Sequence, residues 1–156
     1  MAKAIPEGHS TVTPSFTFKD SKKAIDFYKK AFSAKVLGLF PNPTGQGIMH
    51  ATIQIGNSIL MMGDEGMGPN KSAETLGGSP ISLFVYVPDA DAAFKQAVEA
   101  GGTPTMPVDD QFWGDRAGAI QDPFGHSWMI ATHTQDLTQE QVRINAEAFF
   151  SQTAKR

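Results

Sequence analysis

The sequence contains no cysteine, and this absence removes several classes of site at once. Without a thiol there is no disulfide framework, no cysteine nucleophile and no cysteine-ligated zinc. Long apolar runs are also missing: the longest are only a few residues, too short to span a membrane. The N-terminal residues lack the apolar core of a signal peptide, so we expect a cytoplasmic protein.

Charged residues are few, and their positive and negative charges nearly cancel. The 156 residues include 13 Lys and Arg against 16 Asp and Glu, which gives a formal net charge of −3. No run of like charges occurs, so there is no basic patch of the kind that binds nucleic acid. We therefore expect neither nucleic acid nor a membrane as a partner. The length suits one globular domain, or two very small units that share a core.

The hydrophobic pattern repeats once along the chain. In each half, an alternating strand precedes an aspartate, Asp20 or Asp89, that is placed to cap an amphipathic helix. Three more short strands follow each helix. The two aspartates lie 69 positions apart, and residues of the adjoining strands and helices superpose at the same offset. Self-similarity at a fixed offset, with the same order of elements, predicts two tandem βαβββ units.

The repeat and the composition divide the chain into five parts. We expect a leader at 1–10, a first βαβββ unit at 11–66, a linker at 67–79, a second βαβββ unit at 80–134 and a C-terminal helix at 135–156. The linker is rich in Gly, Pro and polar residues, which favours a long exposed connection. Thr138 and Gln141 have the spacing of a capping box at the start of the last helix, which would pack on the domain or on a partner subunit. The fold class is therefore α+β, with two tandem units forming a cupped mixed sheet plus a C-terminal helix.

Alternation along the strands predicts two different faces for each small sheet. The single helix of a unit can cover one face, and apolar residues such as Phe16 and Phe18 are expected there. Polar and aromatic residues of the opposite parity, including Ser15, His50 and Phe84, would then line the concave face. A mixture of apolar area and hydrogen-bonding groups is what a ligand cleft requires. The alternative is that these side chains simply face solvent on an open sheet.

Three segments resemble the vicinal oxygen chelate superfamily, which includes glyoxalase I, extradiol dioxygenases and bleomycin-resistance proteins. They are DSKKAIDFYKKAF after the first strand, VPDADAAFKQAVEAGG after the fifth and DPFGHSWMIATH at the eighth. The longer stretch FWGDRAGAIQDPFGHSWMIATH is similar to the PhnB-like branch in particular. The resemblance covers residues 11–134 and implies a glyoxalase-like fold, a small-molecule ligand and a homodimer. It also implies that two units pair edge to edge around the site, either within one chain or between two.

Metal-dependent members of this superfamily place a His or Glu ligand on the first and the last strand of each unit. The resemblance, combined with the repeat, assigns these positions to Thr13, Met61, Ser82 and Met129. Hydroxyls and thioethers are poor ligands for a hard or borderline divalent ion. We therefore expect no metal at the usual site and no cofactor.

The remaining candidates are ligand-binding residues, and the pattern assigns no catalytic residue. Trp113 and Arg116 could stack on a ligand and clamp an anionic group, or Arg116 could pair with Asp115 to support the loop. The full set expected to bind substrate is Thr13, Ser15, His50, Gln54, Met61, Ser82, Phe84, Trp113, Arg116 and Met129.

The leading hypothesis is a small-molecule-binding protein that needs no metal. One alternative is a metal-dependent lyase or dioxygenase with a displaced metal site that uses His50 or His133. Another is an interaction module without an enclosed cavity.

Overall fold

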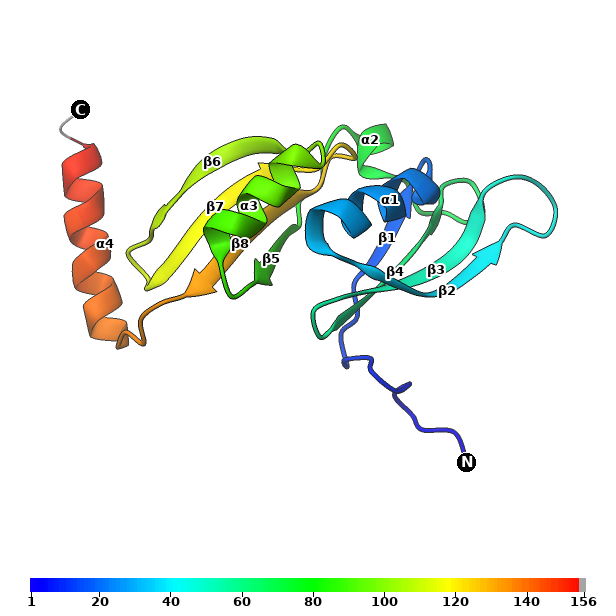
Figure 1. Cartoon of the computed structure of the whole chain (residues 1–156), viewed down its shortest axis with the longest axis horizontal. Helices are drawn as coiled ribbons and strands as arrows, with labels where there is room; N and C mark the ends of the chain where they lie inside the picture. The colour runs from blue at the N-terminus through cyan, green and yellow to red at the C-terminus, as the bar shows by residue number, and fades with distance from the viewer. Residues whose placement is uncertain (155–156) are drawn as a thin grey trace.

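The computed structural model describes residues 1–154 and contains two βαβββ units followed by a separate helix (Figure 1). The first unit comprises β1 (Ser15–Phe18), α1 (Ser21–Phe32), β2 (Lys35–Pro41), β3 (Ile48–Ile55) and β4 (Ser58–Asp64). The second comprises β5 (Ser82–Tyr86), α3 (Ala90–Glu99), β6 (Thr103–Asp110), β7 (Asp115–Gln121) and β8 (Ser127–His133). The short helix α2 (Ala73–Leu76) connects the units, and α4 (Gln139–Thr153) follows them. The expected α+β class is confirmed; residues 155–156 of the expected C-terminal helix lie outside the described residues.

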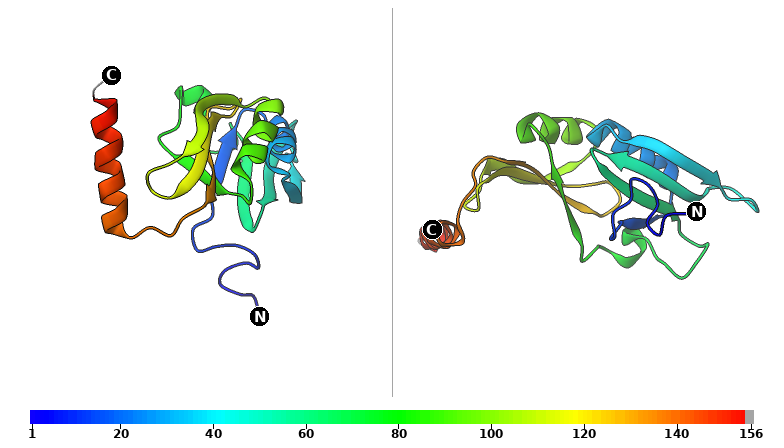
Figure 2. Two further views of the ribbon diagram at one scale, coloured as in Figure 1. Left: turned by 60° about the vertical axis from the view of Figure 1, so that its left-hand side comes forward. Right: turned by 90° about the horizontal axis from the view of Figure 1, so that it is seen from below.

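Each unit forms one four-stranded mixed sheet with its first strand at an edge. The strand orders are β1-β4-β3-β2 and β5-β8-β7-β6, in which β1–β4 and β5–β8 are parallel and the other pairs antiparallel. Within residues 1–154 the two sheets remain separate, since no ladder joins β1 to β5. Helices α1 and α3 pack against each other and cover the same side of the two sheets (Figure 2). The opposite side of both sheets is left without a helix of its own unit.

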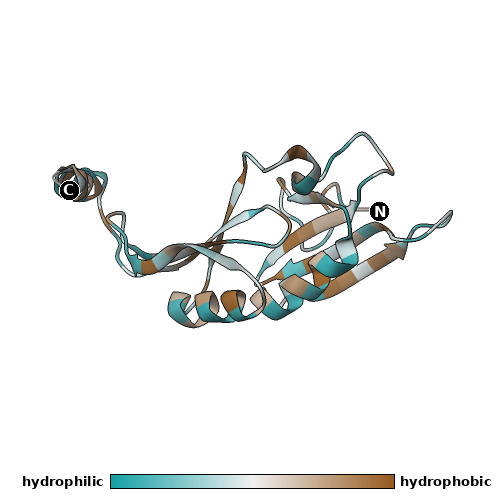
Figure 3. Cartoon of the chain, turned by 90° about the horizontal axis from the view of Figure 1, so that it is seen from above, coloured by the Kyte–Doolittle hydropathy of each residue, from teal (hydrophilic) through white to brown (hydrophobic). Residues whose placement is uncertain are grey.

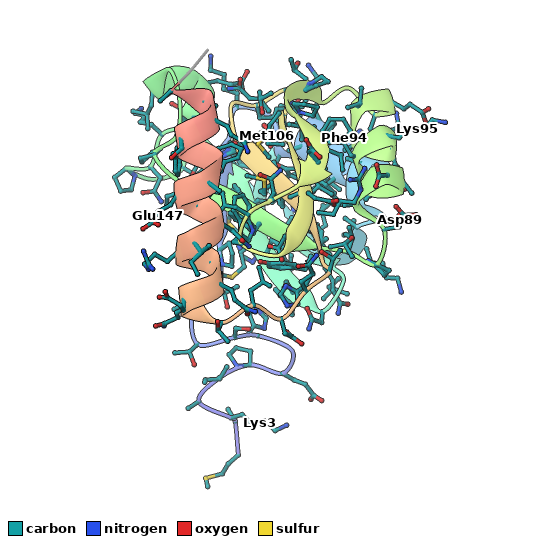
Figure 4. All side chains as sticks on the ribbon, turned by 90° about the vertical axis from the view of Figure 1, so that its left-hand side faces the viewer. Lys3, Asp89, Phe94, Lys95, Met106 and Glu147 are labelled. Carbon is teal, nitrogen blue, oxygen red and sulfur yellow. The ribbon has the colours of Figure 1, made fainter. Side chains whose placement is uncertain are left out.

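The two long helices of the units form where the sequence predicts them. The side chains of Asp20 and Asp89 accept hydrogen bonds from Lys23 N and Ala92 N, which satisfies free N–H groups of each first turn. Figure 3 shows hydrophobic and hydrophilic residues alternating along both helices, as expected for amphipathic helices at a surface. Phe94 of α3, labelled in Figure 4, lies over Gly118 of β7, where an added Cβ would come within 3.0 Å of the ring.

One buried carboxylate joins the two units of the chain. Asp122, in the β7–β8 turn, accepts hydrogen bonds from Tyr28 Oη of α1 at 2.6 Å and from Trp128 Nε1 at 3.0 Å. It also accepts from the backbone N–H groups of Phe124 and His126. Burial, together with the adjacent Asp122 carboxylate, raises the pKa of Tyr28 well above its ordinary value. The two units of one chain therefore share a single core.

The linker is mostly exposed, but one short stretch of it is anchored to the domain. Ser72 is only 1% exposed and caps α2, and Ala73 beside it is also buried. The Glu65 carboxylate at the end of β4 accepts hydrogen bonds from Ser72 Oγ and Thr75 Oγ1, which lower the pKa of Glu65 to about 2. A polar segment can thus be held against a domain when its buried polar groups find partners, and composition alone does not show this.

Helix α4 stands apart from the sheets (Figures 1 and 2). Thr138 and Gln141 form the expected capping box at its start. Its contacts with the second unit are centred on Phe112, whose ring lies 5.6 Å from that of Phe149 and 5.9 Å from that of Phe150. Phe149 and Phe150 are nevertheless exposed. None of the helices in residues 1–154 combines the length and the hydropathy needed to cross a membrane.

Candidate ligand-binding surface

The face of the second sheet that points away from α3 presents two aromatic rings. Phe84 and Tyr86 of β5 lie opposite Met129 and Ala131 of β8, on the side of β8 that does not face the helices. The rings of Phe84 and Tyr86 stack with centroids 6.2 Å apart and an interplanar angle of 29°. They are 51% and 61% exposed, so the pair is accessible to a flat apolar molecule.

A buried carboxylate lies beside this aromatic pair. Asp115, at the start of β7, is 2% exposed and accepts hydrogen bonds from Trp113 Nε1 at 2.8 Å and Tyr86 Oη at 3.1 Å. His133, its cross-strand partner at the end of β8, places Nδ1 2.7 Å from Asp115 Oδ1. The other ring nitrogen, Nε2, lies 2.9 Å from the carboxylate of Asp136, which is fully exposed. We call Tyr86, Trp113, Asp115 and His133 the Asp115 cluster.

The electrostatics of the Asp115 cluster favour an ionised carboxylate. Burial alone would raise the pKa of Asp115, but the hydrogen bonds from His133, Trp113 and Tyr86 outweigh it and hold the pKa below its ordinary value. The hydrogen bond to Asp115, with a further one to Asp136, raises the pKa of His133. Burial and the same carboxylate raise the pKa of Tyr86, which keeps its hydroxyl a donor.

Gly114 allows the loop that carries Trp113 to approach the end of β8. Its φ of +99° lies in a region that favours glycine. The backbone N–H groups of Thr134 and Gln135 both donate to the Gly114 carbonyl, and a Cβ on Gly114 would lie 2.5 Å from the Gln135 oxygen. The Trp-Gly-Asp sequence therefore serves a backbone requirement as well as supplying the Trp113 and Asp115 side chains.

A cleft of about 810 Å³ opens between the two units next to the aromatic pair. Phe84 and Tyr86 line it from the second unit, and Phe32, Gln54 and Asn57 line it from the first. The indole of Trp128 also contributes to its wall. Most of the lining is apolar with a few hydrogen-bonding groups, and the volume lies in the range of small-molecule sites. Tyr86 is common to the lining of this cleft and to the Asp115 cluster.

A smaller hollow of about 570 Å³ lies between β1 and the linker. Ser15 and Thr17 line it from the strand, Lys71 from the linker, and His126 from the β7–β8 turn. Burial lowers the pKa of His126, and its Nε2 atom has no hydrogen-bond partner among the described residues. A neutral imidazole packed edge-on against Phe16 and Phe18 is consistent with a role in the core.

The structure brings some of the expected ligand-binding residues together. Gln54 and Phe84 line the larger cleft, and Trp113 belongs to the Asp115 cluster. Met129 lies opposite Phe84 in the sheet, whereas Ser82 lies two pairs further along, opposite Ser127.

Other expected residues lie elsewhere. Ser15 lines the smaller hollow, and Met61 is its cross-strand partner. His50 lies on β3 of the first sheet, with Nε2 3.3 Å from Thr52 Oγ1. Thr13 precedes β1, which begins only at Ser15, and its hydroxyl donates to the Ser10 carbonyl.

Arg116 lies on the other side of the sheet from Phe84 and Tyr86. It has the same parity as Gly118, faces α3, and donates to both carboxylate oxygens of Asp91 at 2.6 and 2.8 Å. A third hydrogen bond joins it to Asp110 at 3.2 Å. These carboxylates raise the pKa of Arg116, and Asp115 is not among its partners. The considered pair with Asp115 is therefore replaced by an ion pair between β7 and α3, and a ligand clamp by Arg116 stays a prediction.

Asp115, Tyr86 and Trp128 were missing from the expected set, and His133 entered as a displaced metal ligand or as a residue at the border of the pocket. The sequence did contain a pattern that pairs Asp115 with His133. Counting outward from the Asp122–Gly125 turn through the antiparallel pair of β7 and β8 places these two residues opposite each other. Trp128 carries no such signal, because its place in the cleft depends on how the two units pack.

The residues at the usual metal positions do not fit a divalent ion. The register corrects two of the expected positions: Ser15, not Thr13, faces Met61, and Phe84, not Ser82, faces Met129. None of these four side chains offers a carboxylate or an imidazole. Across residues 1–154 no three His, Cys, Asp or Glu side chains gather in an arrangement that could hold a metal. Both ring nitrogens of His133 are already directed at carboxylates.

Comparison with known proteins agrees with this fold. The model of the glyoxalase/bleomycin resistance protein/dioxygenase superfamily matches residues 12–130. The chain belongs to this superfamily. An uncharacterized protein of Mycobacterium bovis, Mb0911c, is 35% identical over 136 residues, which cover 85% of this chain and 89% of the relative.

Solved structures show the same architecture. The crystal structure of the Arabidopsis thaliana gene product At5g48480 is 25% identical with a TM-score of 0.64, covering 78% of this chain and 98% of that one. The PhnB protein from Bacillus cereus is 20% identical with a TM-score of 0.63, covering 79% of this chain and 99% of that one. The similarity to the PhnB protein shows a shared fold, in line with the PhnB-like segment of the sequence.

Proposed function

We propose that this protein binds a small, planar and largely apolar molecule, without a metal ion, in the cleft between its two units. The observation that carries the proposal is the stacked Phe84–Tyr86 pair, half-exposed at the wall of an 810 Å³ cleft. Stacked rings offer a large apolar area in a fixed orientation, and a flat ligand can extend the stack. Gln54 and Asn57 across the cleft supply the polar groups that would orient it.

The side chains at the usual metal positions favour ligand binding over metal-dependent catalysis. A glyoxalase-like lyase or dioxygenase requires a metal ion with open coordination positions, and Ser15, Met61, Phe84 and Met129 supply no suitable ligand. The displaced site with His50 or His133 gains no support: within residues 1–154 the one hydrogen bond of the His50 ring is to Thr52, and His133 is held between two aspartates.

A homodimer in the cytoplasm is part of the same proposal. Strands β1 and β5 lie at sheet edges, where a second copy could add a strand or close a cleft. The exposed Phe149 and Phe150 of α4 offer further apolar area for a partner.

Binding of an aromatic dye tests the proposal. Anilinonaphthalene sulfonate carries a flat naphthalene ring and fluoresces when it leaves water, and Trp128 in the cleft wall can transfer excitation energy to it. We expect saturable binding with energy transfer that excess EDTA leaves unchanged. Replacing Phe84 by alanine should weaken binding about tenfold, because half of the aromatic pair is lost.

Phe40 provides the matched control. It lies on β2, away from the cleft, and is 56% exposed against 51% for Phe84. Phe40→Ala should therefore bind the dye as the unaltered protein does. Equal losses in the two variants would refute binding at this cleft, and loss of binding with EDTA, restored by one metal, would refute metal independence.

A further inference from the structure

We propose that His133 acts as a general acid–base residue, oriented by Asp115, on a planar aromatic compound stacked on Phe84 and Tyr86. The inference rests on the proposed function for the position of that compound. It adds an activity, proton transfer, and assigns it to one nitrogen atom, Nε2 of His133.

The buried Asp115 carboxylate fixes the imidazole ring. Its contact of 2.7 Å with His133 Nδ1 requires the proton on that nitrogen, since a carboxylate only accepts. In the neutral ring the lone pair is then on Nε2, the nitrogen on the exposed side. Trp113 and Tyr86 hold the carboxylate in turn, so Asp115 cannot rotate away without losing two more hydrogen bonds. Asp115 is thus a positioning residue.

The partner of the exposed nitrogen is the surface side chain of Asp136. The contact of Nε2 with Asp136 can form only when the ring is doubly protonated, because both groups would otherwise be acceptors. Asp136 is fully exposed, and ion pairs of exposed side chains contribute little to stability. Deprotonation of His133 therefore releases Asp136 and leaves Nε2 open to a ligand.

The aromatic pair places a ligand next to that nitrogen. Tyr86 Oη and His133 Nδ1 bind the two different oxygens of the one Asp115 carboxylate, at 3.1 and 2.7 Å. The phenol and the imidazole are therefore neighbours on the same face. A flat molecule stacked on Tyr86 can direct an acidic C–H or O–H group at Nε2.

The step is a proton transfer that balances without a further reactant. The ligand C–H or O–H bond breaks, its electron pair stays on the ligand, and the proton forms an N–H bond with Nε2. The resulting imidazolium faces Asp115 from β7, Asp136 from the segment after β8, and the neutral Tyr86 hydroxyl from β5. Two carboxylates stabilise its charge, and the proton can return to the ligand in the reverse direction.

Base-catalysed ring opening of nitrobenzisoxazole tests this inference. The probe is a flat bicyclic aromatic compound; loss of its C–H proton to a base breaks the N–O bond and releases a coloured cyanophenolate. We expect the full chain to accelerate the reaction. In His133→Gln the rate should be about 100-fold lower, which is a usual contribution of general-base catalysis. His50→Gln is the matched control, because His50 is also half-buried on a sheet face, and its ring has no carboxylate partner among the described residues.

Asp115→Asn separates positioning from a merely structural role. The carboxylate raises the pKa of His133, and only the unprotonated ring is a base, so the rate should rise with pH through that pKa. In the Asn variant the midpoint of the pH profile should move to lower pH, which a general loss of folding would not produce. Circular dichroism checks the fold of each variant.

Two results would overturn the inference: an unchanged rate in His133→Gln, or an equal loss in His50→Gln. If the aromatic dye still binds in either case, the proposed function stands and only the acid–base role is lost. If the dye does not bind, the proposed function itself fails.

Discussion

Replacing Asp122 by alanine is expected to lower the free energy of unfolding by about 3–5 kcal/mol. The carboxylate is 4% exposed and accepts four hydrogen bonds, two from the Tyr28 and Trp128 side chains and two from backbone N–H groups. Removing it leaves buried donors without a partner, and each such group costs about 1–3 kcal/mol. Because the acceptor joins α1 to the β7–β8 turn, both units should lose stability together. Denaturant unfolding monitored by tryptophan fluorescence measures the loss.

Tyr28→Phe provides the graded control for Asp122. It removes one of the four donors and keeps the ring, which is fully buried, so about 1 kcal/mol should be lost. If Asp122→Ala is no more destabilising than Tyr28→Phe, the carboxylate does not join the two units. A single unfolding transition in both proteins is expected, since the units share one core.

Gly114→Ala is expected to destabilise the protein by about 2–4 kcal/mol and to weaken dye binding. The new Cβ would lie 2.5 Å from the backbone oxygen of Gln135, so the loop or the end of β8 must move. That movement displaces Trp113 and the hydrogen bond from its indole to Asp115. Thermal unfolding and dye titration of the variant measure the two effects.

Gly66→Ala is the control that separates the steric clash of a new Cβ from the strain of a positive φ. The φ of Gly66 is +101°, close to the +99° of Gly114, but a Cβ there would meet nothing within 4 Å. Gly66→Ala should therefore cost about 1 kcal/mol, the usual strain of a side chain in this region, and leave dye binding intact. Similar losses in the two variants would show that the contact with Gln135 is unimportant.

The fold could be predicted from the sequence because its signals are local and occur twice. Asp20 and Asp89 cap their helices through contacts only three residues away, and the alternation of each strand is visible within a few residues. The two α+β units, their order and the C-terminal helix follow from such signals. The short α2 does not, since it depends on the side chain of Glu65 reaching Ser72 and Thr75.

The site depends on register, which sequence alternation leaves open. Aligning the two helix caps assigns Thr13 and Ser82 as equivalent positions, but hydrogen bonding pairs Met61 with Ser15 and Met129 with Phe84. A shift of two residues keeps the same face, so alternation does not reveal it. The role of Arg116 could not be predicted from the sequence either. Its partner Asp91 lies on α3, 25 residues earlier in the chain, and only the packing of α3 on β7 brings the two together.

The two tryptophans test the central inference most directly, since both lie at the proposed site. Trp128 lines the cleft, and the indole of Trp113 donates to Asp115 beside the aromatic pair. The sequence contains only these two, so the indole N–H region of a ¹H–¹⁵N spectrum should hold two signals. Adding the dye in the presence of EDTA is expected to shift both signals along a saturable curve. If both stay in place while dye fluorescence rises, the ligand binds elsewhere and the proposed site is wrong.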